Sequence, residues 1–239
     1  MNLQECLDKL ARGKLSNLSI CSGGKIKDEH RQKVIDAVNE GLLRIYTALP
    51  IKEKSLIIEM TESRTEYPFT SEHSLRNETG SIYDSYDLYI RDTDFYPFED
   101  DILNIIEVWD DLDRKRPIND PEHPLSVFTP EPNTLNVNFT SEARVLNVIY
   151  WAKHKLLTLE NLTDTIELPT NIEGALLSFV AYSIHGDMNT ETAVANSQKY
   201  YAEYQNIVNE VIQQGTLNPD KLVLDRKFIQ RAWVREVMY

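Results

Sequence analysis

His185 and Asp187 flank a single glycine, and they are the pair in this sequence that most resembles a reaction centre. A histidine near an aspartate can act in acid/base chemistry or bind a metal, but either use needs a third group. No such group follows at helical or hairpin spacing, and Gly186 stands where a left-handed residue would end a helix. The favoured prediction is a corner between two helices at His185, Gly186 and Asp187. The alternative is a small cytosolic metal-dependent hydrolase that uses His185 and Asp187.

A second candidate is the segment FEDDILNIIEVWDDLD, residues 98–113, which carries seven carboxylates and no base. Its paired aspartates could collect Mg²⁺ or Ca²⁺, but no EF-hand-like loop surrounds them. The segment is therefore either a solvated face of the protein or an acidic lining that repels a polyanion. The residues of this predicted acidic conduit or surface are Glu99, Asp100, Asp101, Asp110 and Asp111.

The remaining reactive side chains form no known catalytic or metal-binding motif. Cys6 and Cys21 lack a neighbouring histidine motif, and the five histidines make no HExxH or paired-ligand pattern. The stretch CSGGK lacks the spacing of a phosphate loop, so we expect a flexible connection there. Tyr200, Tyr201 and Tyr204 are expected to pack or to form an interface, since base stacking would need nearby cations. The sequence thus predicts a protein that is not an enzyme and needs no metal or cofactor.

The formal net charge of the 239-residue chain is −13, which argues against tight binding of DNA. Residues 221–239 carry five bases and two acids, so this tail is +3 and the preceding chain is −16. No apolar run approaches the roughly 20 residues of a membrane span, and the N-terminus lacks a signal peptide's apolar core. We expect a protein made in the cytosol, without a membrane partner. Its basic tail is expected to bind a different surface from the acidic segments beside it in the chain.

Apolar residues recur at helical spacing in the first fifth of the chain. They predict a short helix over residues 3–11 and a long helix over residues 28–49, which Pro50 ends. The two helices are joined across the sequence SGG.

Helical spacing returns near residue 170. Thr170 and Glu173 fit a capping box, in which each side chain accepts a hydrogen bond from the other residue's backbone N–H. The helix that follows runs to the corner described above. Asn189 or Thr190 can cap a second helix, which is expected to stop at Gly215. Together they predict a helical hairpin.

The middle of the chain has β-type patterning. KSLIIEMT is apolar and β-branched, while YDLYIR and TLNVNFT alternate apolar with polar residues, so all three predict strands. ARVLNVIYWA follows closely enough to pair with TLNVNFT in a hairpin, whereas the proline-rich residues 114–133 predict an irregular loop. The predicted fold is α+β: an antiparallel helical bundle of residues 1–50 and 165–215, a β-rich insert of residues 51–164 between its first long helix and its C-terminal hairpin, and a C-terminal tail of residues 216–239.

Several of these segments resemble the head-to-tail adaptor proteins of tailed bacteriophages, also called connector, neck or tail tubular A proteins. IELPTNIEGALLSFVAYSIHGDMNTETAVANSQKYYAEYQ is similar to their helical hairpin, with a Leu-Pro before an Ala-Leu-rich helix, an AY..H..MN corner and a Tyr-Tyr-x-x-Tyr helix. KVIDAVNEGLLRIY resembles their first long helix, and residues 100–137 resemble the β-rich insert of adaptors from short-tailed phages. The resemblance covers most of residues 28–213.

This resemblance implies a structural protein of the virion, made in the host cytoplasm and located at the neck or tail. It implies a dodecameric ring under the portal protein that joins the capsid to tail or nozzle proteins. Double-stranded genomic DNA would pass through the ring without being bound tightly. An acidic lining suits this role, because it would repel a polyanion and let it slide.

The resemblance also implies that the C-terminal tail reaches the portal. Residues 217–239 are too apolar for a solvated end, and they combine aromatic and arginine residues of the types enriched at interface hot spots. The alternative is a terminal helix packed on its own bundle, which the basic charge would suit equally well. The predicted portal-docking residues are Phe228, Arg231, Trp233, Arg235 and Tyr239.

Overall fold

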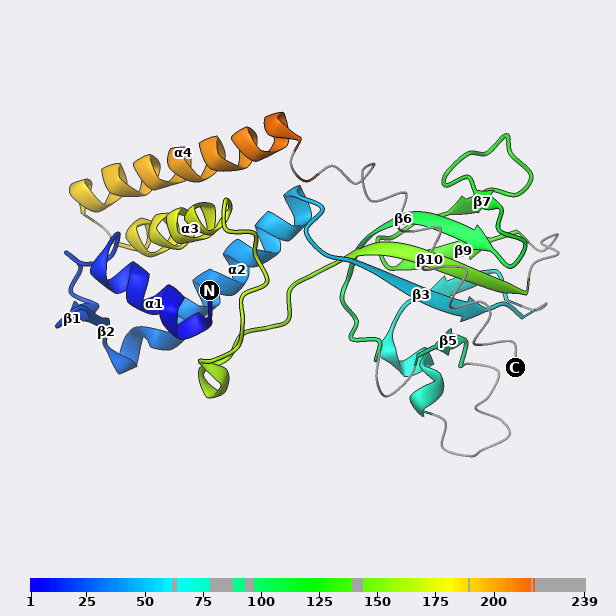
Figure 1. The fold of residues 1–239 in the computed structure, drawn as a ribbon, viewed down its shortest axis with the longest axis horizontal. Helices are drawn as coiled ribbons and strands as arrows, with labels where there is room; N and C mark the ends of the chain where they lie inside the picture. The colour runs from blue at the N-terminus through cyan, green and yellow to red at the C-terminus, as the bar shows by residue number, and fades with distance from the viewer. Residues whose placement is uncertain are drawn as a thin grey trace. The chain divides into compact units, whose positions relative to one another are not determined.

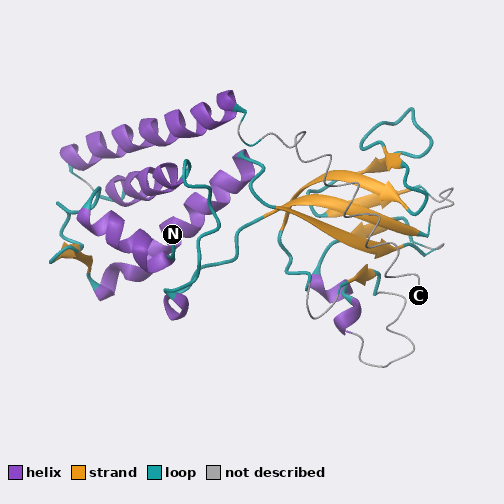
Figure 2. Ribbon diagram, in the orientation of Figure 1, coloured by secondary structure: helices purple, strands orange, loops and turns teal. Residues whose placement is uncertain are grey.

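The structure is a computed structural model and describes residues 1–61, 64–77, 88–92, 97–138, 144–188, 190–215 and 217. Over these residues the fold is mixed α+β, with four α-helices and antiparallel sheets, which confirms the predicted class (Figures 1 and 2). The chain divides into two compact units. The helical unit comprises Met1–Ile51 and the described residues from His154 onward, and the sheet unit comprises Lys52–Lys153.

The helical unit begins with two helices where the sequence predicts them, α1 (Leu3–Arg12) and α2 (Asp28–Ala48). A capping box starts α1: the Asn2 side chain accepts from the Glu5 N–H, and the Glu5 carboxylate accepts from the Asn2 N–H. The apolar residues of both helices that recur at helical spacing are buried.

The connection between α1 and α2, which the sequence predicted only as a flexible connection, contains a tight hairpin. Strand β1 (Cys21–Ser22) pairs antiparallel with β2 (Lys25–Ile26). Gly23 and Gly24 form its two-residue loop with φ of 58° and 73°. Two successive left-handed residues define a turn that glycine enters without a Cβ clash.

The helical hairpin consists of α3 (Glu173–Gly186) and α4 (Glu191–Gln214). Both predicted ends of α4 are confirmed: Thr190 accepts a hydrogen bond from the Ala193 N–H, and Gly215 is left-handed with φ of 58°. The start of α3 is different. Its N-cap residue is Ile172, which has no capping hydrogen bond, so the predicted capping box of Thr170 and Glu173 is wrong.

The Glu173 side chain instead forms ion pairs with two groups near the N-terminus. Its carboxylate lies 3.1 Å from the amino group of Met1 and 3.1 Å from Nζ of Lys9. Two cations outcompete the single backbone N–H of a capping box, because charge-assisted hydrogen bonds are the stronger ones. Glu173 thereby ties α3 to α1.

Contact between α2 and α3 is very close at Gly41. A Cβ atom at this position would lie 2.8 Å from Cδ1 of Phe179 and 2.9 Å from Cδ1 of Leu176. Both side chains are buried on α3. The absence of a side chain at Gly41 therefore lets the two helices pack at this distance.

The sheet unit contains a five-stranded antiparallel sheet in the order β5-β3-β10-β6-β7. Val148 at its centre pairs with Leu56 on one side and Val108 on the other. The strands are β3 (Glu53–Glu59), β5 (Ile90–Arg91), β6 (Ile102–Asp110), β7 (Lys115–Arg116) and β10 (Val145–Ala152).

A second antiparallel sheet has the order β4-β9-β8, and the two sheets bury one continuous apolar cluster. From this sheet the cluster takes Tyr67, Val127 and Leu135. The strands are β4 (Glu66–Pro68), β8 (Val127–Phe128) and β9 (Thr134–Val137). The sheet unit also contains two short 3₁₀ turns, η1 (Ser71–His73) and η2 (Leu75–Asn77). A third, η3 (Leu159–Asn161), lies in the helical unit.

Two local predictions about this region are wrong. The strands β9 and β10 do not form a hairpin, because β9 pairs with β4 and β8 while β10 pairs with β3 and β6. Residues 114–133 are not wholly irregular, since they contain β7 and β8. In the first case strands distant in the sequence supply the partners of β10, whereas β7 and β8 pair with their neighbours in the sequence, β6 and β9.

We predict that Gly41→Ala lowers the free energy of unfolding of the helical unit by about 1 kcal/mol. Overpacking typically costs about 1–3 kcal/mol, which exceeds the gain of up to about 1 kcal/mol in helix propensity. The measurement is urea denaturation followed by circular dichroism at the helical band.

Gly174→Ala is the matched control, because a Cβ there would meet only Cδ1 of Ile207 at 3.4 Å. This variant should be as stable as the parent or more so. Equal stability of the two alanine variants would show that α2 and α3 do not need the glycine contact.

Candidate functional site

The side chains of His185 and Asp187 are directed to different parts of the helical unit. His185 is buried, and its Nε2 lies 3.2 Å from the carbonyl oxygen of Lys14. Asp187 is exposed at the C-cap of α3, where its carboxylate lies 2.9 Å from Nζ of Lys33. Each group therefore has a structural partner of its own.

Gly186 does not adopt the left-handed conformation that the sequence predicted. It is the last residue of α3, and Asp187 follows as a C-cap with φ of −76° and ψ of −6°. A Cβ at Gly186 would lie 3.3 Å from Oγ of Ser197, which itself donates to the carbonyl of Tyr182. The glycine is needed for close approach of α4 rather than for a left-handed turn.

The acidic segment is not a uniform surface, and the prediction is wrong for two of its residues. Asp101 and Asp110 are only 4% and 6% exposed, whereas Glu99, Asp100 and Asp111 are exposed. The segment folds as strand β6, which pairs with β10 along most of its length and with β7 at Val108 and Trp109.

Asp101 is fixed at the start of this strand by two partners. The hydroxyl of Tyr150 donates to its Oδ1 over 3.1 Å, and Nζ of Lys54 lies 2.6 Å from Oδ2. Lys54 also lies 3.2 Å from the carboxylate of Glu99. A buried carboxylate with a cation and a hydroxyl is compensated and structural.

Asp110 is held more extensively at the other end of the strand. Its Oδ1 accepts hydrogen bonds from the backbone N–H groups of Leu112 and Arg114. Its Oδ2 accepts hydrogen bonds from the guanidinium Nε atoms of Arg114 and Arg116, at 2.9 and 3.0 Å. Burial alone would raise the pKa of Asp110, but these N–H groups and guanidinium charges outweigh it and hold the pKa below its ordinary value. Arg116 is itself buried, so each charge needs the other.

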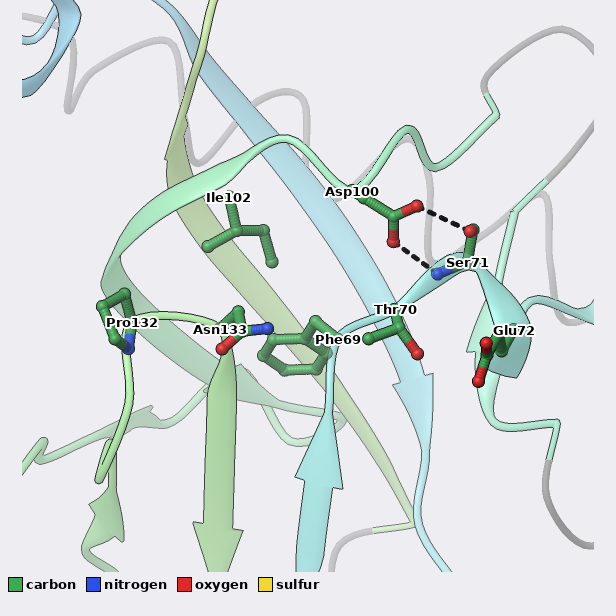
Figure 3. Close-up of a pocket in the computed structure, with 8 residues that line it drawn as sticks. All are labelled: Phe69, Thr70, Ser71, Glu72, Asp100, Ile102, Pro132 and Asn133. Carbon is green, nitrogen blue, oxygen red and sulfur yellow. Dashed lines mark hydrogen bonds between the residues drawn. The ribbon is translucent and has the colours of Figure 1, made fainter. Parts of the chain in front are cut away.

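A hollow of about 520 Å³ in the sheet unit was not predicted from the sequence. The Asp100 carboxylate accepts the N–H and the hydroxyl of Ser71 there, at 2.5 and 2.6 Å (Figure 3). Among the described residues that line the hollow there is no histidine, and the Asp100 carboxylate holds the Ser71 hydroxyl as a donor. Its lining comes from three separate segments: Phe69, Thr70, Ser71, Glu72, Asp100, Ile102, Pro132 and Asn133.

The tyrosines of α4 pack within the helical hairpin. The Tyr201 ring lies 4.8 Å from that of Tyr182, and the Tyr204 ring lies 5.4 Å from that of Phe179. Tyr200 differs, because Nζ of Lys14 lies 4.8 Å from its ring centroid. A cation from outside α4 thus reaches this tyrosine, although α4 alone offers few.

Cys6 is buried within α1, and burial raises the pKa of its thiol to about 12. Among the residues that the structure describes, no group of three His, Cys, Asp or Glu side chains could hold a metal ion. No helix in the same part of the chain is long and apolar enough to cross a membrane. The predicted docking residues lie outside the described residues: Phe228, Arg231, Trp233, Arg235 and Tyr239.

No model of a known protein family matches this sequence, and no curated protein matches it.

For the corner between α3 and α4, we predict that Gly186→Val is more harmful than Asp187→Ala. A valine would push against Ser197, at a cost of about 1–3 kcal/mol, whereas Asp187→Ala loses an exposed ion pair that contributes at most about 1 kcal/mol. The measurements are unfolding by circular dichroism and oligomer mass. A Gly186→Val variant that is as stable as Asp187→Ala would contradict the packing role of the glycine.

For Asp110 we predict a stability effect that depends on pH. Asp110→Asn should cost about 3 kcal/mol at neutral pH, because it leaves the Arg116 charge buried without its carboxylate. The pKa of Asp110 is lower in the folded than in the unfolded state. The stability that its charge contributes is therefore complete above the ordinary pKa of about 4, and it is lost as the pH falls through the lower folded-state value.

Unfolding of the sheet unit can be followed by the fluorescence of Trp109 and Trp151. The stability difference between the parent and Asp110→Asn should shrink below about pH 4. Asp111→Asn, at the exposed neighbouring carboxylate, is the control and should have little effect at any pH. A difference for Asp110→Asn that does not change with pH would disprove the electrostatic explanation.

Proposed function

We propose that this protein is a head-to-tail adaptor of a tailed bacteriophage, a structural virion protein rather than an enzyme. In this proposal it forms a ring under the portal protein, joins the capsid to the tail and provides a conduit for genomic DNA. The observation that carries the proposal is the path of the chain: α2 and α3 pack together, although residues 52–153 between them form the separate sheet unit. An adaptor-like bundle with a β-rich insert has this chain order.

The adaptor-like motifs fall on elements of the appropriate kind. KVIDAVNEGLLRIY lies within α2, and the Ala-Leu-rich stretch after Leu168 and Pro169 begins α3. The corner motif spans the end of α3, and the Tyr-Tyr-x-x-Tyr motif lies in α4. This agreement supports the resemblance along the helical part of the chain.

A ring also requires contacts between copies. In a cyclic ring each subunit uses two different patches, which must close on one another. α4 offers one candidate patch, because Val194 and Ile212 are large apolar residues that are 48% and 53% exposed. They are separated by about five full turns, so they lie on the same side of the helix. This side of α4 is where we place the contact with a neighbouring copy.

The remaining parts of the proposal follow from the resemblance. The ring is a dodecamer, its partners are the portal protein and tail or nozzle proteins, and it resides at the neck of the virion. Residues 216–239 form the tail that docks on the portal. The exposed acids Glu99, Asp100 and Asp111 belong to a surface that does not bind DNA tightly.

We predict that the purified chain forms a closed ring with the portal protein of the same phage, visible by negative-stain microscopy and countable by native mass spectrometry. Val194→Glu with Ile212→Glu should prevent ring formation without unfolding the protein, because buried carboxylates cannot be compensated in an apolar contact. Leu112→Glu, at a similarly exposed leucine of the sheet unit, is the control and should assemble normally.

A chain that ends at Gly215 separates the two kinds of contact. It should keep its helical circular dichroism and lose portal binding. A folded parent protein that stays monomeric with the portal present would overturn the adaptor proposal, and a truncated chain that still binds the portal would overturn the docking role of the tail.

A further inference from the structure

Residues 12–27 form a basic stretch within the acidic part of the chain that precedes the C-terminal tail. They contain four bases, Arg12, Lys14, Lys25 and Lys27, and no acid, although the protein has a net charge of −13. The other exposed side chains of this stretch are short donors, namely Ser16, Asn17, Ser19 and Ser22. This composition is typical of segments that contact phosphate groups.

The fold gathers three of these cations around the β1–β2 hairpin, which lies beside α1 (Figure 1). Lys25 and Lys27 stand on either side of the buried Ile26, so both side chains point away from the core. The Arg12 side chain reaches the turn, where its Cγ lies 3.6 Å from the position of a Cβ on Gly24. Arg12, Lys25 and Lys27, which we call the basic hairpin, are all exposed.

The basic hairpin has no ion pair within the described part of the chain. Lys14 is different, since its Nζ lies 2.6 Å from the carboxylate of Glu203. The acids that follow Lys27 in the sequence are already engaged: Asp28 pairs with Arg31 and Glu29 lies beside His30. The three charges of the hairpin are therefore available to an external anion.

The surroundings of these charges favour a phosphate backbone over an acidic protein surface. The large exposed apolar residues of the described chain, such as Leu43 and Ile212, all lie outside residues 12–27. A protein interface would need an apolar or aromatic centre, whereas phosphate contacts use cations, short hydroxyl side chains and backbone N–H groups.

We propose that the basic hairpin contacts the phosphate backbone of double-stranded DNA. This inference rests on the proposed function, in which DNA is the polyanion that passes the ring. Three cations on an acidic protein provide a contact that is independent of base sequence and sensitive to salt. Such a contact can steady a passing duplex without holding it.

The test is fluorescence anisotropy of a short labelled DNA duplex with the full-length protein, titrated with salt. Three phosphate contacts predict a slope of about −2.7 for log affinity against log salt concentration. The variant Arg12→Gln, Lys25→Gln, Lys27→Gln should lose at least about tenfold in affinity at low salt and most of this slope. Circular dichroism checks that the variant is folded.

The control variant Lys33→Gln, Arg44→Gln, Lys115→Gln removes the same total charge from cations that are already paired with Asp187, Glu40 and Glu107. It should lose less than about threefold in affinity, because paired cations release few counterions from DNA. Equal losses in the two variants would overturn the proposal, since net charge alone would then explain binding.

Competition with polyglutamate distinguishes the two kinds of anionic partner. Polyglutamate that displaces the duplex at equal charge concentration would assign the hairpin to acidic protein surfaces and overturn the DNA contact. Ring formation is measured separately, so the two proposals can fail independently: a ring without hairpin-dependent DNA binding refutes only the hairpin, and DNA binding without a ring refutes only the adaptor.

Discussion

The close packing of α2 against α3 is the contact on which the helical unit depends. α2 ends before the sheet unit and α3 begins after it, so this contact closes a loop that contains residues 52–153. The entropic cost of closure grows only slowly with loop length, and a helix contact with no side chain at Gly41 can offset it by apolar burial. The Glu173 carboxylate adds a second tie, to Met1 and Lys9. A loop of this size between the two helices is therefore compatible with a stable helical unit.

The burial of each carboxylate in the acidic stretch, rather than its position in the sequence, determines its structural role. Asp101 and Asp110 belong to the same acidic stretch as Asp100 and Asp111, but they are buried with cations and fix the ends of β6. Their neighbours remain exposed and contribute to the negative surface. One run of carboxylates thus supplies both internal anchors and external charge, which a count of acids cannot separate.

The elements that could be predicted from the sequence are those fixed by local physics. The apolar period of α2, the hydroxyl of Thr190 and the left-handed Gly215 all act within a few residues, and each was predicted correctly. The errors have non-local causes. Glu173 follows a capping pattern but binds Met1, 172 residues away. Gly186 lies close to Ser197 on the next helix instead of forming a left-handed turn.

The candidate sites show the same division. The strand β6 was not predicted, because the acidic residues at both of its ends suggested a charged surface and the apolar residues between them were not recognised as a strand. The hollow beside Ser71 is formed by three segments with no shared pattern, so no spacing in the sequence indicates it. The CSGGK stretch lacks the spacing of a phosphate loop, but spacing does not reveal the two left-handed glycines that form its hairpin.

Ion pairing finally separates the charges that can act on a partner from those that cannot. Lys33, Arg44 and Lys115 are exposed but already have carboxylate partners, so an approaching polyanion would have to displace them. The basic hairpin has no such competitor among the described residues. In the adaptor that we propose, free cations at this turn can attract the phosphate backbone while the many carboxylates of the chain limit adhesion.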